Sequence, residues 1–392
     1  MQYRVNKKNG DRLSVLGYGC MRFTRNGGFI DQEKAEKELL YALEHGVNYF
    51  DTAYMYPGNE TAVGKFLSKG YRQQVYLATK LPQYLAKSYE DFDRFFNEEL
   101  KRLQTYYIDY YLLHMLSDFH SWQRLQELGI EKWIDGKKKT GQIRNIGFSY
   151  HGGSTGFMAI LDAYDFDFCQ IQFNYLDVNA QAGEKGVKYA ASKGMPVIIM
   201  EPLRGGRLVQ GLPKAARDFW QNAEPKRSCA EWGLRWVWNY PEVTVVLSGM
   251  NSIEQVKENV SVASQPLENA MSENELELFD RARAIIRANT KVPCTGCTYC
   301  MPCPAGVDIP VCFNALNVKQ SDGWFNGMRE YIMCTSFKTN PTNASKCVRC
   351  GRCEKLCPQG IKIRDQLDTV VKELENPLYK IFMKAARIVG KF

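Results

Sequence analysis

The sequence predicts an α/β protein in which a closed (β/α)8 barrel is followed by a small cysteine-rich domain. Three observations support this prediction. Apolar strand-like runs alternate with amphipathic segments up to about residue 265, the composition changes near residue 290, and eight of the 13 cysteines lie in two short runs close to the C-terminus. Repeated βα units with continuously apolar strands are typical of a TIM barrel, whose strands are buried on both faces.

Eight segments fit the barrel strands. They are residues 15–20, 47–51, 75–80, 108–114, 143–149, 168–173, 196–200 and 244–248. A helix expected between the first two strands begins after Asp31, a good N-cap residue, and ends at Gly46. An open doubly wound sheet is the alternative, but the first strand and turn, LGYGCMRF, lack the G-x-G-x-x-G spacing of that fold.

The ends of the chain differ from the repeated units. Asn9-Gly10 lies between two short alternating segments and predicts a hairpin that closes the bottom of the barrel. A helix is expected from Ser272 to about Ala288, and the tail predicts a helix interrupted at Asn376-Pro377. The predicted domains are therefore a barrel at 1–285, a cysteine-rich domain at 286–365 and a helical tail at 366–392.

Composition excludes several classes of protein. The 392 residues are 45% hydrophobic and 24% charged, which is ordinary for a globular protein. Because the chain has neither a run of 18 apolar residues nor an apolar signal-peptide region, we expect a cytoplasmic protein without a transmembrane segment. The net charge of +8 is spread along the chain without a basic run interleaved with aromatic residues, so we expect no nucleic-acid partner.

Three consecutive expected strands end in an ionisable residue. These residues are Asp51, Lys80 and His114. Active sites of (β/α)8 barrels form at the carboxyl ends of the strands, where these side chains would meet and Lys80 could pair with Asp51. Tyr56 follows on the loop over the same end, and a neighbouring ammonium would lower its pKa and make it a usable proton donor.

Asp51, Tyr56, Lys80 and His114 together resemble the catalytic tetrad of the aldo-keto reductases. The sequence FDTAYMYPGNE, which contains Asp51 and Tyr56, adds to this resemblance. The resemblance covers roughly residues 3–290. It implies a (β/α)8 barrel that reduces a carbonyl, or oxidises an alcohol, with NADPH or NADH. It also implies that Asp51, Tyr56, Lys80 and His114 are the catalytic residues, with Tyr56 as general acid.

The same resemblance implies a set of nucleotide-binding residues. They are Gly19, Cys20 and Met21 after the first strand, Ser149, Gln170 and Met200 at the nicotinamide, Leu203, Gly205 and Gly206 at the pyrophosphate, and Gly249, Met250, Gln255, Glu258 and Asn259 at the adenosine end. Met200 stands where many relatives have a tyrosine. The last group lacks the Lys and Arg that many relatives use for a 2′-phosphate, which favours NADH.

The two cysteine runs indicate iron–sulfur ligation. The second run, Cys347-x2-Cys350-x2-Cys353-x3-Cys357-Pro, has the bacterial ferredoxin spacing, and the first run places Cys294, Cys297, Cys300 and Cys303 at intervals of three. Structural zinc fits three closely spaced thiolates poorly, and disulfides need an oxidising compartment. We therefore expect two [4Fe-4S] clusters in an α-rich ferredoxin-like domain.

In such domains the fourth cysteine of each run binds the other cluster. One cluster would then take Cys294, Cys297, Cys300 and Cys357, and the other Cys347, Cys350, Cys353 and Cys303. The shortened spacing before Cys303 leaves Cys312 as a substitute ligand. The insert between the runs is expected to form a helix pair that covers the clusters or docks on the barrel.

The whole chain resembles the subgroup of aldo-keto reductases fused to a two-cluster ferredoxin-like domain. The first functional hypothesis is a carbonyl reductase in which the clusters are an electron port or a structural element. The second is an electron-transfer enzyme with a flavin in the barrel and a ferredoxin-like or flavodoxin-like carrier as partner, although no residue pattern here demands a flavin. The third is a redox-sensing nucleotide-binding protein.

Overall fold

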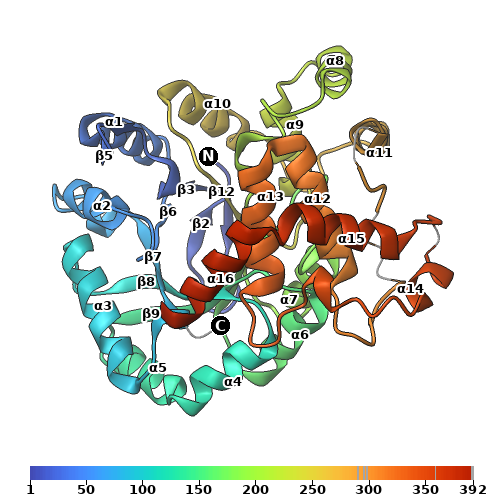
Figure 1. Ribbon diagram of the computed structural model, residues 1–392. Coiled ribbons are helices and arrows are strands. Elements are labelled where there is room, and N and C mark those ends of the chain that lie inside the picture. The colour runs from blue at the N-terminus through green and yellow to red at the C-terminus, as the bar shows by residue number, and fades with distance from the viewer. Residues whose placement is uncertain (289–290, 295, 297–298, 358, 390–392) are drawn as a thin grey trace.

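Eight parallel strands form a closed barrel in the computed structural model, which describes all residues except 289–290, 295, 297–298, 358 and 390–392 (Figure 1). The predicted (β/α)8 barrel is thereby confirmed. The strands are β3 (Leu16–Gly19), β6 (Tyr49–Asp51), β7 (Tyr76–Leu81), β8 (Ile108–Leu116), β9 (Ile143–Tyr150), β10 (Phe168–Gln172), β11 (Val197–Met200) and β12 (Val243–Ser248). They follow one another in chain order around the barrel, and β12 pairs with β3 to close it.

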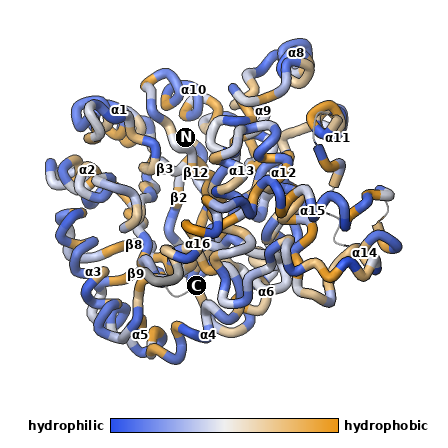
Figure 2. The backbone as a smooth tube through the Cα atoms, viewed as in Figure 1, coloured by the Kyte–Doolittle hydropathy of each residue, from blue (hydrophilic) through white to orange (hydrophobic). Residues whose placement is uncertain are grey.

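Amphipathic helices surround the strands. They are α1 (Gln32–Glu44), α2 (Asn59–Leu67), α3 (Tyr89–Leu103), α4 (Phe119–Glu127), α5 (Ile130–Lys139), α6 (Ser154–Ala163), α7 (Gly183–Ser192), α8 (Lys214–Asn222), α9 (Cys229–Trp238), α10 (Ile253–Ala263) and α11 (Glu273–Ala288). Asp31 caps α1 as expected, because its side chain accepts a hydrogen bond from the Lys34 N–H at 3.1 Å. Figure 2 shows hydrophilic and hydrophobic residues alternating along the turns of α1 and α3.

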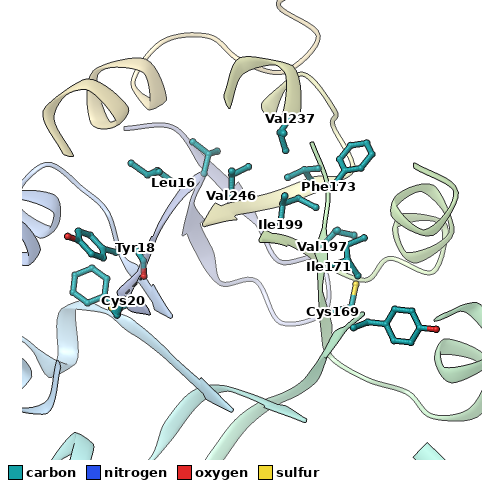
Figure 3. Packing of buried hydrophobic residues seen from close by; sticks show 14 of the residues in the cluster. Leu16, Tyr18, Cys20, Cys169, Ile171, Phe173, Val197, Ile199, Val237 and Val246 are labelled. Atoms are coloured by element: carbon teal, nitrogen blue, oxygen red, sulfur yellow. Dashed lines mark hydrogen bonds between the residues drawn. The ribbon is translucent and has the colours of Figure 1, made fainter. Parts of the chain in front are cut away.

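Two apolar layers hold the barrel together. The outer layer lies between strands and helices, and Figure 3 shows part of it, where Leu16, Val246 and Ile199 pack near Val237 of α9. The inner layer fills the barrel with the side chains of alternate residues such as Val245 and Leu247. Gly17 faces this inner layer, and a Cβ there would lie 2.7 Å from the Leu247 side chain. Only glycine therefore fits the strand at this point.

A hairpin closes the end of the barrel opposite the carboxyl ends of the strands. β1 (Tyr3–Val5) pairs antiparallel with β2 (Arg12–Ser14), which confirms the turn expected at Asn9-Gly10. Asn9 Nδ2 donates to Asn145 Oδ1 at 2.9 Å, and Leu13 joins the inner apolar layer. Because the hairpin fills this end, the other end of the barrel is the one left to form a site.

The C-terminal part of the chain has a hydrophobic core of its own. Its helices are α12 (Ile309–Asp322), α13 (Trp324–Tyr331), α14 (Arg352–Lys355), α15 (Ile363–Leu374) and α16 (Pro377–Val389), drawn in orange and red in Figure 1. The core runs from Val292 to Met383 and includes Tyr379 of α16, so the tail packs on the helices that precede it. The domain boundaries at residues 285 and 365 stay predictions.

The expected helix pair in the insert is present as α12 and α13. The interruption expected at Asn376-Pro377 is found between α15 and α16, and Leu378 and Ile381 of α16 are exposed. Among the described helices, none combines the length and the apolar character needed to cross a membrane.

Candidate active site

A buried ion pair joins β6 and β7 at the carboxyl end of the barrel. Lys80 Nζ lies 2.7 Å and 2.6 Å from the two carboxylate oxygens of Asp51, and it donates a third hydrogen bond to the Thr52 carbonyl at 2.7 Å. The side chains are buried, with relative exposures of 1% for Lys80 and 3% for Asp51. The pair that the strand ends predicted is therefore confirmed.

The stagger of the strands explains how these residues meet. Asp51 lies opposite Ala78 of β7, so Lys80 is two residues further along on the same face. Lys80 lies opposite Leu112 of β8, and His114 is again two residues further on. Each step to the next strand thus moves the ionisable residue forward by two positions, and all three side chains point into the same end of the barrel.

Tyr56 lies on the loop after β6, next to this group. Its ring is half-buried and stands edge-on to the His114 ring, with centroids 6.1 Å apart. The Lys80 ammonium lies 5.4 Å from the centroid of the Tyr56 ring. His114 is 7% exposed, and its Nδ1 has no hydrogen-bond partner within the described part of the chain. A phenol and an imidazole therefore share one small region with a buried ammonium.

Burial sets the protonation states of these groups. Burial lowers the pKa of Lys80, but the Asp51 and Tyr56 side chains outweigh it and raise that pKa above 10.5. The pKa of His114 falls well below 6.5 because of burial and the nearby Lys80 charge. At neutral pH the site accordingly holds a charged Lys80 and a neutral His114.

The expected lowering of the Tyr56 pKa is wrong. Burial raises this pKa above its ordinary value of 10.0, and the charge of Lys80 only partly offsets the effect. The phenol therefore keeps its proton at neutral pH and can donate it, but it is a weaker acid than the sequence suggested.

The residues expected at the nicotinamide lie on the three following strands. Ser149 and Gln170 are opposite each other in β9 and β10, and Met200 ends β11. The Ser149 hydroxyl accepts a hydrogen bond from the Met115 N–H at 2.8 Å. Gln170 hydrogen-bonds to Asp51, whereas its buried Oε1 atom has no partner among the described residues. An amide group with a free acceptor thus faces the centre of the barrel.

The expected pyrophosphate loop follows β11. Gly205 and Gly206 both have positive φ angles, 68° and 93°, which glycine adopts without strain. Leu203 is half-buried beside them. Cys20 and Met250 are buried in the outer apolar layer, so their side chains face away from any ligand and only their backbones are available.

At the adenosine end the expected residues fall into two groups. Gly19 and Gly249 lie close together, since a Cβ on Gly19 would lie 3.5 Å from the Gly249 nitrogen. The side chains of the others make protein contacts: Gln255 accepts from the Asn251 N–H at 3.0 Å, Asn259 donates to Ser248 Oγ at 3.0 Å, Glu258 accepts from Ser228, and Met21 is exposed.

One residue of this region was not predicted. Arg22 follows Met21, and its side chain runs beside Gly249, where a Cβ would lie 2.9 Å from Arg22 Cδ. The guanidinium also lies against Gly205. It therefore places a positive charge between the expected pyrophosphate loop and the expected adenosine segment, although Arg22 itself follows β3 and the adenosine segment follows β12. A basic residue just after the expected contacts at Gly19 to Met21 was the available signal.

The cysteines of the second domain surround its apolar core. Cys353 is buried, Cys350 is exposed, and Cys294, Cys300, Cys303, Cys347 and Cys357 are half-buried. The Arg349 N–H donates to Cys347 Sγ at 3.4 Å, a contact of the kind that tunes iron–sulfur ligands. Thiol donors in an apolar shell fit a cluster, although no three potential ligands converge within the described residues. Cys297 lies outside those residues, so the ligand assignment stays a prediction.

Comparison with known proteins identifies both halves. Residues 15–275 match the model of the aldo/keto reductase family, and residues 293–362 match a 4Fe-4S dicluster domain. The chain belongs to the aldo/keto reductase family. It is an oxidoreductase of that family with a 4Fe-4S dicluster domain at its C-terminal end.

Relatives of this oxidoreductase cover the barrel. The methylglyoxal reductase YeaE of Escherichia coli is 30% identical over 72% of this chain and 95% of its own length. Among solved structures, the holo form of the aldo-keto reductase AKR11C1 from Bacillus halodurans has a TM-score of 0.61, 27% identity and coverage of 72% and 96%. An aldo/keto reductase from Klebsiella pneumoniae in complex with NADP and acetate has a TM-score of 0.59, 25% identity and coverage of 72% and 95%.

The dicluster domain of the reductase contacts the carboxyl end of the barrel. Arg329 of α13 pairs with Glu201 at 3.3 Å, and the Ser117 hydroxyl donates to the Phe337 carbonyl at 3.0 Å. His151, which follows β9, is buried, and its Nδ1 contacts Gln181 Oε1 at 3.2 Å. The insert between the two cysteine runs therefore forms part of the wall around the active site.

A cavity of about 680 Å³ separates the two domains of the reductase beside this contact. Arg204 and Arg207 line it from the loop after β11, and Cys294 and Asn314 line it from the dicluster domain. Arg204 pairs with Asp177 at 3.1 Å, and Arg207 pairs with Asp322 at 3.3 Å. The expected pyrophosphate loop and a predicted cluster ligand therefore border the same space.

Proposed function

We propose that this reductase transfers a hydride from a nicotinamide nucleotide to the carbonyl carbon of an aldehyde or ketone, with Tyr56 as the proton donor to the oxygen. The observation that carries the proposal is the phenol beside a fixed ammonium at the carboxyl end of the barrel. Lys80 cannot leave this position, because Asp51 and the Thr52 carbonyl hold it with three hydrogen bonds.

Each residue has a role that follows from its protonation state. Tyr56 keeps its proton until negative charge develops on the substrate oxygen, and Lys80 stabilises the phenolate that remains. Neutral His114 does not compete as an acid and can hydrogen-bond the carbonyl oxygen. Asp51 holds Lys80 in place and compensates its buried charge. The nucleotide supplies the hydride when it is bound.

The structure has features that suit a nicotinamide nucleotide. The free Oε1 of buried Gln170 can accept from a carboxamide, and Gly206, which has open space beside it, leaves its backbone accessible to a pyrophosphate. Arg22 supports NADPH, because a guanidinium beside Gly249 can bind a 2′-phosphate. The NADP-bound Klebsiella relative supports the same choice, so we now propose NADPH where the sequence favoured NADH.

The test of this function is a substitution of Tyr56. We expect Tyr56→Phe to lower the rate of carbonyl reduction about 10²–10⁴-fold, because the variant lacks the proton donor. The measurement is single-turnover oxidation of NADPH by a panel of aldehydes. Tyr54→Phe, two residues away on the same loop, is the matched control and should keep full activity. An active Tyr56→Phe enzyme would disprove the proposed mechanism.

The cysteine domain is proposed to hold two [4Fe-4S] clusters with the ligand sets expected from the sequence. The ferredoxin spacing and the match to a dicluster domain support this proposal. We propose the cytoplasm as the compartment, because it keeps thiols reduced. The clusters would exchange electrons with a ferredoxin-like or flavodoxin-like carrier, or they would stabilise the fold of the C-terminal domain.

The cavity between the domains favours a second candidate function. Its volume of about 680 Å³ lies in the range of small-ligand sites, and it borders both the nucleotide loop and Cys294. A flavin there could accept a hydride and release single electrons, which would make the protein an electron-transfer enzyme. Anaerobic extraction of the native protein tests this candidate. Stoichiometric flavin would support it, and a flavin-free protein that reduces aldehydes at full rate would exclude it.

A further inference from the structure

The second cysteine run lies at the surface of the dicluster domain. Cys350 is exposed, whereas Cys347 and Cys357 are half-buried. Two large apolar side chains of the same run are also exposed, Val348 at 69% and Leu356 at 48%. The helix that follows Cys350, α14, lies at the outer edge of the molecule (Figure 1). A predicted cluster ligand and two apolar side chains are therefore open to a partner.

Positive charge predominates around these residues. The segment 345–365 has six Lys and Arg residues against two acids. Both acids are paired within the segment, since Arg364 Nη2 lies 2.7 Å from Glu354 and Arg349 Nη2 lies 3.2 Å from Asp365. Four exposed cations remain that have no ion pair within the described part of the chain, and we call them the basic surface: Lys346, Arg352, Lys355 and Lys362.

Internal contacts hold this surface in place. The Arg364 N–H donates to Glu354 Oε1 at 2.9 Å, and the Arg364 guanidinium donates to Glu354 Oε2 at 3.0 Å and 2.7 Å. These bonds fix α14 against the start of α15, where Lys362 lies. Arg352 and Lys355 are three positions apart in α14 and share one face of it. Three of the four cations therefore belong to one fixed unit.

The first cysteine run faces the barrel instead. A Cβ on Gly296 would lie 3.3 Å from the Cβ of Asn179, which belongs to the loop after β10. Cys294 lines the cavity between the domains. The first run therefore borders the barrel, and the second run borders the solvent. The outer cluster of the expected pair would be the one bound by Cys303, Cys347, Cys350 and Cys353.

An acidic protein is the partner that the basic surface fits. Surface cations without partners attract negatively charged molecules and orient their approach. The apolar side chains of Val348 and Leu356 supply area that becomes dry on contact. A membrane fits less well, because α14 has only four residues and interfacial helices commonly have about 20–30. Because Cys350 is exposed at the same place, the acidic protein expected here is an electron carrier.

We propose that the basic surface docks an acidic one-electron carrier protein, and that electrons enter or leave the chain beside the second cysteine run. This inference rests on the proposed clusters and adds the place where a carrier binds. Each transfer moves one electron and no atom, so the carrier is oxidised when the domain is reduced, or the reverse. Weak, transient binding is expected, since electron-transfer complexes bury little area.

Binding of an acidic flavodoxin to the full-length, cluster-loaded protein tests the proposal. Titration calorimetry at low salt measures the dissociation constants of the wild type and of two double variants. Lys346→Glu with Lys355→Glu should weaken binding at least about tenfold, because two attractive contacts become repulsive. If this variant binds flavodoxin as tightly as the wild type does, the proposal is wrong.

Lys132→Glu with Lys139→Glu is the matched control. Both lysines are exposed on α5, neither has an ion pair among the described residues, and the net charge changes by the same amount. This variant should bind flavodoxin as the wild type does. Equal weakening in both double variants would mean that net charge alone attracts the carrier, which contradicts a local docking surface.

Cross-linking decides the case in which Lys346→Glu with Lys355→Glu loses its iron. A carbodiimide joins the carboxylates of flavodoxin to lysines of the wild type, and mass spectrometry locates the products. We expect them at Lys346, Lys355 and Lys362. Products confined to other lysines would overturn the proposal. So would sedimentation with phosphatidylglycerol vesicles in the absence of flavodoxin binding, because the surface would then bind a membrane.

Stopped-flow mixing tests the electron exchange itself. Reduced flavodoxin is mixed with the oxidised protein, and oxidised flavodoxin is mixed with the reduced protein. One of the two mixtures is thermodynamically downhill, and its rate should fall in Lys346→Glu with Lys355→Glu. The absence of transfer in both mixtures would refute the electron port.

Iron and sulfide analysis of the same preparation separates this inference from the proposed function. A protein that contains two clusters but does not bind flavodoxin disproves the docking surface and leaves the proposed clusters intact. A protein without clusters that still binds flavodoxin at the basic surface supports the docking surface and disproves the proposed clusters.

Discussion

The two polar centres of this oxidoreductase are held together by different means. In the barrel, Asp51 and Lys80 lie near the carboxyl ends of hydrogen-bonded strands, and Lys80 Nζ is 2.6 Å from Asp51 Oδ2. In the dicluster domain the cysteines lie on short turns around α14, and no three potential ligands converge among the described residues. The strand ladders preorganise the first centre, whereas a bound cluster would cross-link the cysteine-bearing turns of the second.

The largest loss of stability is expected from a variant that leaves one partner of the Asp51–Lys80 ion pair unpaired. Lys80→Met should destabilise the barrel by about 3–5 kcal/mol, because it leaves the Asp51 carboxylate buried without a partner. Carbonyl reduction should fall with it. Urea unfolding followed by tryptophan fluorescence measures the stability, and the double variant Asp51→Asn, Lys80→Met should recover much of the stability but no activity. If Lys80→Met were as stable as the wild type, the Asp51–Lys80 ion pair would not stabilise the barrel.

A smaller effect, confined to the second domain, is expected from its cysteines. Cys303→Ser should lower the iron content from about eight atoms to about four, because one cluster loses a ligand. Cys312→Ser should keep all the iron, since Cys312 is buried in the apolar core. Iron and sulfide analysis measures the cluster content of both variants. Loss of half the iron in Cys312→Ser, with full iron in Cys303→Ser, would identify Cys312 as the ligand. In both variants the barrel should unfold as in the wild type.

The smallest effect concerns pH. The pKa of His114 is well below 6.5 in the folded protein because burial disfavours its charged form. The unfolded chain therefore binds more protons, and this residue should make stability decrease as the pH falls below about 6.5. His114→Asn should show a shallower decrease between pH 7 and pH 5 in urea unfolding. An unchanged slope would mean that His114 binds as many protons in the native state as in the unfolded chain.

The sequence predicted the barrel and the strand-end residues because both follow from local patterns. An apolar run that stops at a charge identifies Asp51, Lys80 and His114, and parallel strands bring such ends together. The pKa of Tyr56 could not be predicted in the same way, since it depends on how far packing removes the ring from water. The contacts of Arg22 could not be predicted either, because Gly205 and Gly249 lie more than 180 positions away in the chain.

The cysteine-rich domain shows what sequence spacing does not predict. Their spacing indicates the cofactor from sequence alone, but spacing does not say which surface of the domain faces the barrel. That orientation depends on contacts such as Arg329 with Glu201, between residues that carry no recognisable motif.

The hydrogen bond between Ser117 and Phe337 joins the barrel to the insert of the dicluster domain. Because the insert lies at the carboxyl end of the barrel, substitutions between the two cysteine runs are expected to alter the surroundings of Tyr56 and His114 without replacing either residue. Removing the C-terminal domain would open this end of the barrel to water.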